Sequence, residues 1–349
     1  MKSINKELNI NNSEQDDFLH QPVFTKQETE EDSVLNLSLR PEQFDDFVGQ
    51  NKIKQNLQIA LQAAKTRGEP LEHLIFSGPP GLGKTTLAHI IAQQMGTKIT
   101  MTSGPAIGRA GDLIGILTNL EYGDVLFIDE IHRLSKVVEE FLYPAMEDYK
   151  IDFIIDKGPY AKTINFNLKP FTLIGATTRS GLLTSALRSR FGMYYHLDFY
   201  PWQDLKEIIQ KSASVLGMQI DDESAGLIAK RARGTPRIAN RLLRRVRDYV
   251  QVKGDGRISA EFTIAALNLQ GIDAIGLDNI DRKVLEVLIN TYDGGPVGID
   301  SLSATLNEES DTIMDVVEPY LLKIGFLKRT QRGRQASDLA YRHLGKIVK

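Results

Sequence analysis

The residues Gly78-Pro79-Pro80-Gly81-Leu82-Gly83-Lys84-Thr85 match the phosphate-binding pattern G-x-x-x-x-G-K-[ST] at every fixed position. An apolar stretch, residues 71–76, precedes them, and an amphipathic segment follows, so the motif lies between a predicted strand and a predicted helix. The glycines let backbone N–H groups converge on a phosphate, and the helix N-terminus adds its positive dipole end. We therefore expect Lys84 to contact the β- and γ-phosphates of ATP and the Thr85 hydroxyl to ligate Mg²⁺.

Two carboxylates follow the next strongly apolar run. Residues 125–128 have the length and composition of a buried parallel strand, and Asp129 and Glu130 come directly after it. Ligands of open α/β sheets bind at the carboxyl ends of the strands. We expect Asp129 to hold Mg²⁺ and Glu130 to orient the attacking water. The alternative is a pair of acids that merely begins a helix, where carboxylates suit the dipole.

A third apolar run, residues 171–176, also ends in polar residues. We expect Thr178, with Thr177 as second choice, to place a hydroxyl beside the γ-phosphate; ordinary strand-end threonines are the alternative. Strands and helices alternate up to about residue 200, which predicts a parallel α/β domain over residues 34–200. Within it, residues 151–168 alternate on both sides of a Gly-Pro turn, which predicts a β-hairpin.

Two arginines are placed to reach a phosphate. Arg190 lies just before the helical part of the chain, where it can serve a neighbouring subunit as an arginine finger or form an ordinary surface salt bridge. Arg237 follows Thr235 and Pro236, which suit a helix cap and the first helical position. A cation in the first turn of a helix opposes the dipole, so Arg237 either faces an anion or is a solvated charge.

The rest of the chain predicts two helical domains and a tail. Four amphipathic segments, residues 202–216, 222–232, 236–252 and 259–269, predict a small helical domain over 201–271. Three further helices and a basic hairpin predict a winged-helix domain over 272–349; these segments are residues 280–292, 300–306, 310–324 and 328–335. Residues 1–33 are polar, acidic and without period, which is typical of a disordered tail.

The charge distribution indicates local binding of a polyanion. The chain carries a net charge of −3, but residues 227–257 carry +8 and residues 320–349 carry +7. In the second block we expect the hairpin arginines Arg329, Arg332 and Arg334 to contact the DNA backbone, with a soluble loop as the alternative. The preceding helix is acidic, so we expect no reading of bases. Its carboxylates are Glu309, Asp311, Asp315 and Glu318.

Composition excludes several classes of protein. The chain has no cysteine, which rules out disulfide frameworks and thiolate zinc sites. No apolar run approaches the roughly 20 residues of a membrane helix, and the first residues lack the apolar core of a secretory signal. We therefore expect a cytoplasmic location and no membrane partner.

The motifs together resemble the RuvB family of AAA+ ATPases. The strings that carry the resemblance are, in order, GPPGLGKTTLA, DEIHRL, GATTR, LRSRFG, RARGTPRIANRLLRRVRD and GGPVG, and it extends from about Leu37 to Gly345. The resemblance implies a homohexameric ring around double-stranded DNA that drives branch migration of Holliday junctions in recombination and DNA repair. It also implies docking of RuvA on residues 151–168, through Phe153, Ile154 and Ile155, with the RuvC resolvase in the wider complex.

Several residue roles are implied by the resemblance. Arg190 matches the family's arginine finger, Arg237 matches its sensor arginine, and Arg329 and Arg334 match its DNA contacts. The implied nucleotide contacts are Leu39, Arg40, Gly81, Gly83, Lys84, Thr85, Thr86, Glu147, Asp148, Tyr149, Arg190, Tyr200 and Arg237. The chain departs from the family at its acidic tail and at Ser310, where some members carry an arginine. It also departs at Ala186 and Ser189, which replace the more familiar proline and aspartate.

Other AAA+ classes are the rival interpretation. Clamp-loader subunits often carry a cysteine zinc module, which this chain cannot form. Protein unfoldases usually carry an aromatic pore loop, and residues 105–115 offer no candidate. A nucleotide-gated DNA-binding scaffold without hydrolysis would not need the intact acidic pair.

Overall fold

The computed structural model describes residues 38–155, 162–254 and 256–347, which belong to two compact units. One unit comprises residues up to Asp204 together with Thr235–Arg237, and the other comprises Leu205–Gly234 and the residues from Ile238 onward. The expected acidic tail, residues 1–33, lies outside the described residues.

The first unit is built on the expected parallel sheet. Its strands, in the order β2-β3-β6-β1-β7, are β1 (Leu74–Ser77), β2 (Ile99–Ser103), β3 (Val125–Asp129), β6 (Thr172–Thr177) and β7 (Met193–His196). The three central strands are almost completely buried, which explains their continuous apolar runs. The edge strands β2 and β7 are half exposed, so their sequences carry no such run.

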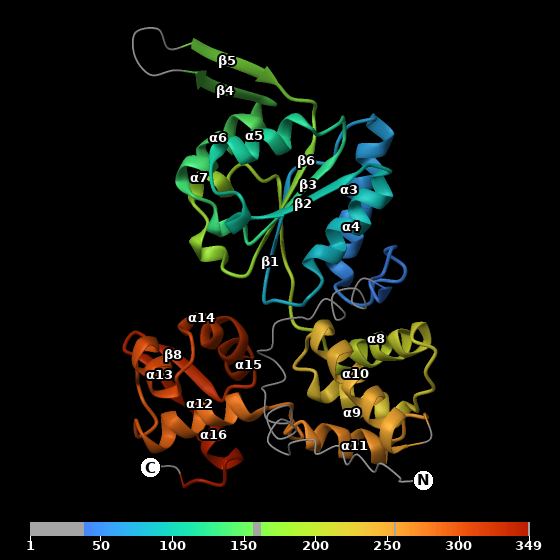
Figure 1. Cartoon of the computed structure of the whole chain (residues 1–349), viewed down its shortest axis with the longest axis vertical. Coiled ribbons are helices and arrows are strands. Elements are labelled where there is room, and N and C mark those ends of the chain that lie inside the picture. Colours follow the sequence, from blue (N-terminus) through green and yellow to red (C-terminus); the bar gives the residue numbers. More distant parts are fainter. Residues whose placement is uncertain (1–37, 156–161, 255, 348–349) are drawn as a thin grey trace, which may run out of the picture. The chain divides into compact units, whose positions relative to one another are not determined.

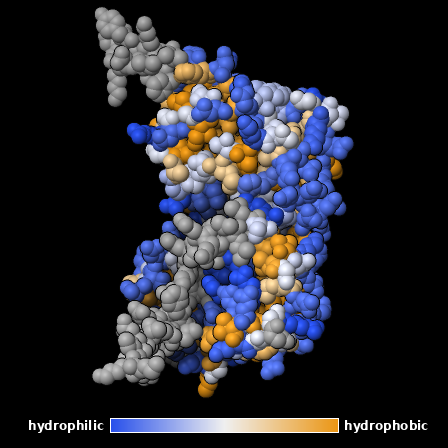
Figure 2. Space-filling model, turned by 45° about the vertical axis from the view of Figure 1, so that its right-hand side comes forward, coloured by the Kyte–Doolittle hydropathy of each residue, from blue (hydrophilic) through white to orange (hydrophobic). Residues whose placement is uncertain are grey.

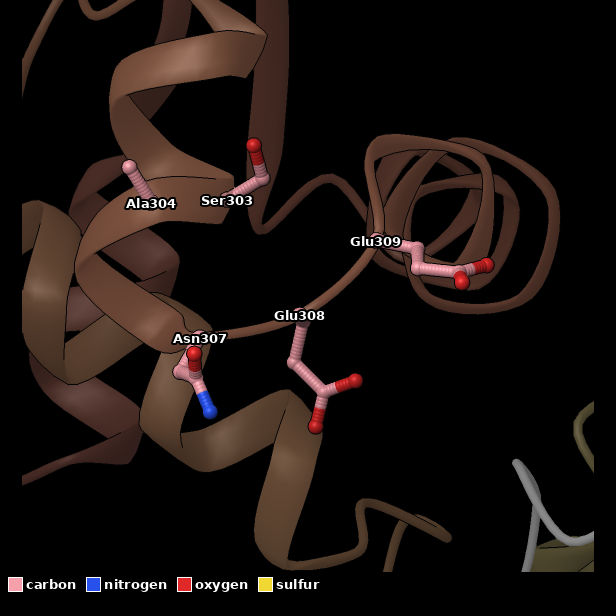
Figure 3. A pocket seen from close by; sticks show the side chains of 5 residues that line it. All are labelled: Ser303, Ala304, Asn307, Glu308 and Glu309. Carbon is pink, nitrogen blue, oxygen red and sulfur yellow. The ribbon is translucent and has the colours of Figure 1, made fainter.

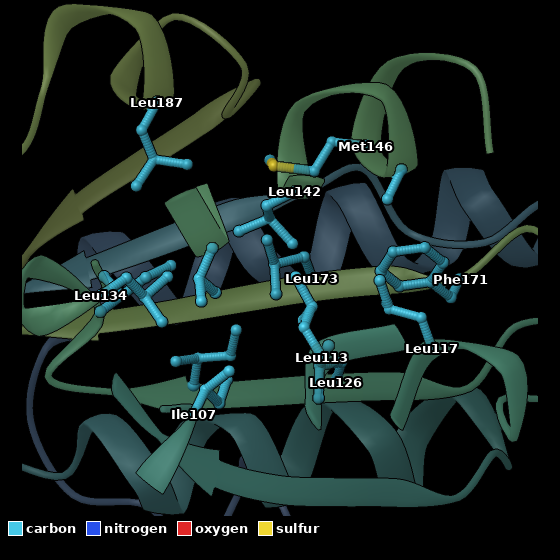
Figure 4. Close-up of a cluster of buried hydrophobic side chains, with 14 of the residues drawn as sticks. Ile107, Leu113, Leu117, Leu126, Leu134, Leu142, Met146, Phe171, Leu173 and Leu187 are labelled. Carbon is cyan, nitrogen blue, oxygen red and sulfur yellow. The ribbon is translucent and has the colours of Figure 1, made fainter. Parts of the chain in front are cut away.

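Helices cover both faces of this sheet (Figure 1). On one side lie α3 (Asn51–Arg67) and α4 (Lys84–Met95); on the other lie α5 (Ala110–Thr118), α6 (Lys136–Glu147) and α7 (Ser185–Arg188). Side chains of the second group pack on the sheet, with Leu113 and Leu142 near Leu126 and Leu173 (Figure 4). Burial of this core fixes the strands whose ends carry the site.

A two-stranded antiparallel sheet extends from this unit (Figure 1). It pairs β4 (Lys150–Ile155) with β5 (Lys162–Asn167), as the alternating sequence predicted. Ile151 is fully buried opposite the exposed Phe166, which anchors the base of the hairpin. The side chains of Phe153, Ile154 and Ile155, expected to meet RuvA, lie outside the described residues.

The second unit contains two helical groups. The first group is α8 (Trp202–Val215), which begins in the other unit, α9 (Asp222–Arg231), α10 (Pro236–Lys253) and α11 (Ala260–Leu269). The second group is α12 (Asn279–Asn290), α13 (Ile299–Leu306), α14 (Ser310–Thr312), α15 (Glu318–Lys323), the hairpin β8 (Leu327–Thr330) and β9 (Gly333–Ala336), and α16 (Asp338–His343). Helices followed by a hairpin form the expected winged-helix domain.

The helix expected over residues 310–324 is interrupted by a π-helical segment, Ile313–Val317. Pro319 follows this segment, and a proline has no N–H to donate to the preceding turn, which accounts for the irregular geometry. Glu318, expected among the carboxylates of an acidic helix, is fully buried rather than presented to solvent.

A buried arginine joins the two helical groups of the second unit. Arg233 follows α9 and is 2% exposed; its Nε donates to the carbonyl of Gly276 at 2.8 Å. Its guanidinium also bonds Asp281 and lies 3.6 Å from Asp278, both at the start of α12. Removing one partner of a buried charge cluster is strongly destabilising. The contacts of Arg233 therefore hold the start of α12 against the end of α9.

Candidate functional site

The phosphate loop connects β1 to α4. Lys84, in the first turn of α4, donates from Nζ to the carbonyls of Gly78 at 2.8 Å and Pro79 at 2.9 Å. Gly78 has a φ of 134°, and a Cβ there would lie 2.5 Å from the Leu197 carbonyl oxygen, so only glycine fits. The following half-buried Thr85 and Thr86 also lie in this first turn, where N–H groups and the dipole favour an anion.

Arg237 and Tyr200 pack directly on the loop. The Arg237 amide donates to the Gly81 carbonyl at 3.4 Å, and a Cβ on Gly81 would lie 2.9 Å from the Arg237 Cβ. The Tyr200 hydroxyl donates to the Leu82 carbonyl at 3.2 Å, and burial raises the pKa of this phenol. Arginine, tyrosine and loop therefore form one packed structure.

The segment before α3 also approaches this region. Leu39 and Arg40 are half buried. Burial, and secondarily the charge of Arg40, lower the pKa of His89 on α4. Arg40 therefore lies close to the helix that carries the phosphate loop.

Three neighbouring strands bring the predicted catalytic residues to one edge of the sheet. Because β3, β6 and β1 are adjacent, Asp129 at the end of β3 lies at the same edge as Thr178 and the phosphate loop, which follow β6 and β1. Burial lowers the pKa of Lys84 to about 8, while the charges of Asp129 and Glu130 oppose this shift and that of Arg237 adds to it. Both carboxylates and Arg237 therefore lie close enough to Lys84 for their charges to act on it.

Glu130 is held by the end of the neighbouring strand. Its Oε2 accepts hydrogen bonds from the Thr178 amide at 3.3 Å and the Thr178 hydroxyl at 3.1 Å, and lies 3.1 Å from Nδ1 of His132. Thr177 is fully buried, and its hydroxyl lies 2.9 Å from the same His132 nitrogen. Glu130 also has a φ of 46°, a left-handed conformation that is uncommon outside glycine and clusters at functional sites.

His132 is a residue of the site that the sequence reasoning left without a role. It lies in the short 3₁₀ helix Ile131–Arg133 that follows β3. The string DEIHRL contains it two positions after Glu130, so its place in that motif was the available signal.

Asp129 and Thr85 fit a magnesium ion bound together with a nucleotide. Asp129 Oδ1 accepts from the Glu130 amide at 2.9 Å, which orients the carboxylate at the strand end. Among the described residues, no group of three or more His, Cys, Asp or Glu side chains could hold a metal alone. Mg²⁺ usually takes one or two carboxylates plus phosphate oxygens and water, which suits a hydroxyl and a single carboxylate.

Arg190 belongs to a second group of residues, at the end of α6 and α7. Its guanidinium donates to the Ala186 carbonyl at 2.7 Å and to Glu147 at 3.1 Å, and lies 4.2 Å from the centre of the Tyr143 ring. Tyr143 in turn donates to the buried Glu139 at 2.6 Å. Asp148 and Tyr149 follow Glu147 in sequence, and the Tyr149 ring packs on Phe171 at 5.8 Å. The structure therefore brings two of the predicted site residues, Arg190 and Glu147, into direct contact.

The expected DNA contacts lie on the wing of the winged-helix domain. Arg329 is on β8 and Arg334 on β9, and both bond the buried Glu318. A shallow hollow near α14 is lined by Ser303, Ala304, Asn307, Glu308 and Glu309 (Figure 3). Ser310, next to this hollow, bonds Ser303 at 3.1 Å. Two carboxylates and a serine offer no cation for a phosphate at this place.

Polar residues cover most of the face in Figure 2, with apolar residues in separate groups. In the part of the chain that the structure describes, no helix is long and apolar enough to span a bilayer.

Comparison with known families gives three matches in sequence order. The Holliday junction DNA helicase RuvB P-loop domain matches residues 39–197, the RuvB AAA lid domain residues 200–273, and the RuvB C-terminal winged helix domain residues 274–345. Among solved structures, the RuvB Holliday junction branch migration motor of Thermotoga maritima is 52% identical, with a TM-score of 0.83 over 89% of this chain and 100% of that chain. A single-substitution variant of RuvB from the same organism is 53% identical, with a TM-score of 0.84 over 89% and 99% of the two chains.

Proposed function

The chain belongs to the RuvB family of Holliday junction branch-migration motors, and we propose that it works as a homohexameric ring whose neighbouring subunits share each ATP site. Its P-loop domain hydrolyses ATP and its winged-helix domain binds DNA. This membership excludes the clamp-loader and unfoldase interpretations. We place the domain boundaries near residues 200 and 271.

In the proposed site, one subunit binds the nucleotide and its neighbour completes the catalytic machinery. Lys84 and Arg237 bind the phosphates, Thr85 and Asp129 hold Mg²⁺, and Glu130 orients the water while Thr178 positions Glu130. The other contacts are Leu39, Arg40, Gly81, Gly83, Thr86 and Tyr200. The action of the Asp129, Glu130 and Arg237 charges on Lys84, together with the hydrogen bonds from Thr178 to Glu130, is the observation that supports this assignment most directly.

The neighbouring subunit supplies Arg190, with Glu147, Asp148 and Tyr149 beside it. Bound Mg²⁺ would neutralise phosphate charge, and the chain's own residues orient the water and stabilise the developing negative charge. Arg190 bonds Glu147 on α6 rather than a residue of its own phosphate loop, which is consistent with action across an interface.

We also propose the partners of the motor. RuvA docks on the hairpin of residues 151–168, and the RuvC resolvase joins the wider complex at the junction. The wing that carries Arg329 and Arg334 contacts the backbone of double-stranded DNA, which gives affinity without sequence preference. We also place the protein in the cytoplasm.

Dissociation of a synthetic four-way junction tests this function. With ATP and RuvA, we expect rapid separation into two duplexes, and with a non-hydrolysable ATP analogue none. Omitting RuvA should slow the reaction strongly, because the motor then lacks its junction-holding partner. ATP hydrolysis with no junction dissociation, even when RuvA is present, would contradict the proposed role.

Nucleotide affinity should depend on the protonation of Lys84. Burial lowers the pKa of Lys84 to about 8 from 10.5. Phosphates favour the ammonium, so its pKa rises on binding, and affinity should fall as pH increases through about 8, by up to about tenfold per pH unit. Calorimetric titration with a non-hydrolysable ATP analogue should show proton uptake at a pH slightly above this pKa, in buffers that differ in ionisation enthalpy.

Two variants test the assignment of that proton. Lys84→Met should abolish the uptake, whereas Lys52→Met, which removes an exposed lysine on α3, should leave it unchanged. The same shift predicts a stability effect of defined sign. Because the folded pKa is below the unfolded value, the nucleotide-free protein should gain stability as pH rises from about 8 toward 10.5. An uptake that persists in Lys84→Met would assign the proton to another group.

A further inference from the structure

Two arginines of the wing share one buried carboxylate. The wing is the hairpin β8–β9, and Arg329 and Arg334 lie directly opposite each other across it. Arg329 Nε donates to Glu318 Oε2 at 2.8 Å, and Arg334 Nε donates to Oε1 at 2.6 Å. Like charges directly opposite in a hairpin destabilise it. The fully buried Glu318 therefore supplies the counter-charge that lets both arginines occupy this position.

The two arginines differ in how much of the side chain is exposed and can donate hydrogen bonds to a ligand. The Arg329 side chain is 52% exposed, whereas that of Arg334 is 15% exposed. The backbone of Arg334 is also fixed, because its N–H and C=O pair with Val297 at 2.8 and 2.9 Å. A guanidinium has five N–H donors, so Arg329 can bond Glu318 along one edge and still offer donors to a phosphate. Arg334 is instead built into the base of the wing.

Glycines hold the wing against the loop that contains GGPVG. A Cβ on Gly333 would lie 2.2 Å from the Val297 carbonyl oxygen, and a Cβ on Gly295 would lie 2.4 Å from that of Arg334. The Ala336 amide donates to the Gly294 carbonyl at 2.9 Å. These close backbone contacts order the wing before any ligand arrives, so the direction of Arg329 is set by the fold and by Glu318.

We propose that Glu318 is a positioning residue for DNA binding. Its carboxylate holds Arg334 in the base of the wing and directs Arg329 toward a backbone phosphate. The inference rests on the proposed function, in which the wing contacts the DNA backbone. A side chain held in its binding geometry loses less conformational entropy on association. Glu318 thus increases affinity for a polyanion although it carries a negative charge.

Removing the charge of Glu318 separates this role from simple electrostatics. In Glu318→Gln the wing gains one net positive charge, so electrostatics alone predicts tighter binding. The positioning role predicts weaker binding, by about threefold or more for each phosphate that the wing no longer binds. Glu309→Gln is the matched control, because it removes an exposed carboxylate of the same winged-helix domain. Affinity of the full chain for duplex DNA is measured between about 50 and 200 mM salt, with thermal unfolding measured alongside.

A double-mutant cycle tests the division between the arginines and leaves Glu318 in place. Arg329→Ala should reduce the slope of log affinity against log salt by about one unit. Arg334→Met should weaken DNA binding as much as Arg329→Ala does. Without Arg334, Glu318 pairs with Arg329 alone, so its negative charge offsets the charge that Arg329 offers to a phosphate. The double variant should bind no more weakly than either single variant, since the effect of Arg334 acts through Arg329.

The outcomes separate this inference from the function it rests on. If Glu318→Gln binds DNA as tightly as Glu309→Gln, or if the two arginine effects add, then Glu318 does not position Arg329. The DNA-binding role of the wing would then still stand. If Arg329→Ala leaves both the affinity and the salt slope unchanged, the wing does not contact the backbone, and the proposed DNA contact fails together with the inference.

Discussion

Arg190→Ala should lower ATP hydrolysis by about 10³- to 10⁵-fold, the range measured for arginine fingers. The loss should fall on the rate of hydrolysis, since we propose that the loop and Arg237, rather than Arg190, bind most of the phosphate groups. Arg190 is 21% exposed and is held by Glu147 and the Ala186 carbonyl against the Tyr143 ring. A preorganised guanidinium stabilises transition-state charge without reorganisation when the reaction occurs.

Mixing two inactive variants tests whether this arginine acts on a neighbouring subunit. Lys84→Ala subunits lack a working phosphate loop but retain Arg190, whereas Arg190→Ala subunits have the reverse defect. In head-to-tail rings formed from equal amounts, about a quarter of the interfaces combine an intact loop with an intact finger. ATP hydrolysis should therefore reappear on mixing. An arginine that served its own subunit's site would give no recovery.

Arg188→Ala is the matched control for the loss of charge. Arg188 is exposed, lies two residues earlier, and donates to the Ser180 carbonyl at 2.5 Å. We expect its removal to reduce hydrolysis far less than removal of Arg190. Equal losses in both variants, measured as turnover at saturating ATP, would show that general charge near α7 rather than a specific finger is responsible.

The parts of the site that the sequence could predict are those with local signatures. The phosphate loop needs its glycines within a short stretch of chain, and β3 needs a continuous apolar run because both of its faces are buried. The acidic pair follows directly from the end of that strand. The phosphate loop and the acidic pair depend on residues that are close in sequence. Their residue types and spacing therefore predict that they lie at the carboxyl edge of the sheet.

The features that could not be predicted depend on contacts between distant residues. Glu318 meets arginines 11 and 16 positions later, and only the fold shows that its carboxylate is buried. Likewise, the contact of Thr177 with His132 joins residues 45 positions apart. The edge strand β2 has half-exposed polar and apolar residues, so it lacks the pattern of a central strand.

Glu130→Gln should lower hydrolysis by about 10²- to 10⁴-fold while nucleotide binding is retained. Glutamine keeps the size and one carbonyl acceptor of the side chain, so its bonds with Thr178 can persist, but it cannot accept a proton from water. Turnover at saturating ATP and affinity for a non-hydrolysable analogue measure the two effects separately. The control is Glu140→Gln, an exposed carboxylate on α6, which should keep full turnover.

Thr178→Val then tests how Glu130 is positioned. The Thr178 hydroxyl and amide both bond Glu130 Oε2, at 3.1 and 3.3 Å, so valine removes one donor and leaves the other. We expect a loss of turnover smaller than that of Glu130→Gln. In the double variant the losses should not add, because residues in one hydrogen-bond network are coupled. Additive losses would mean that Thr178 acts on the γ-phosphate independently of Glu130, and that the bond between them has no part in orienting the water.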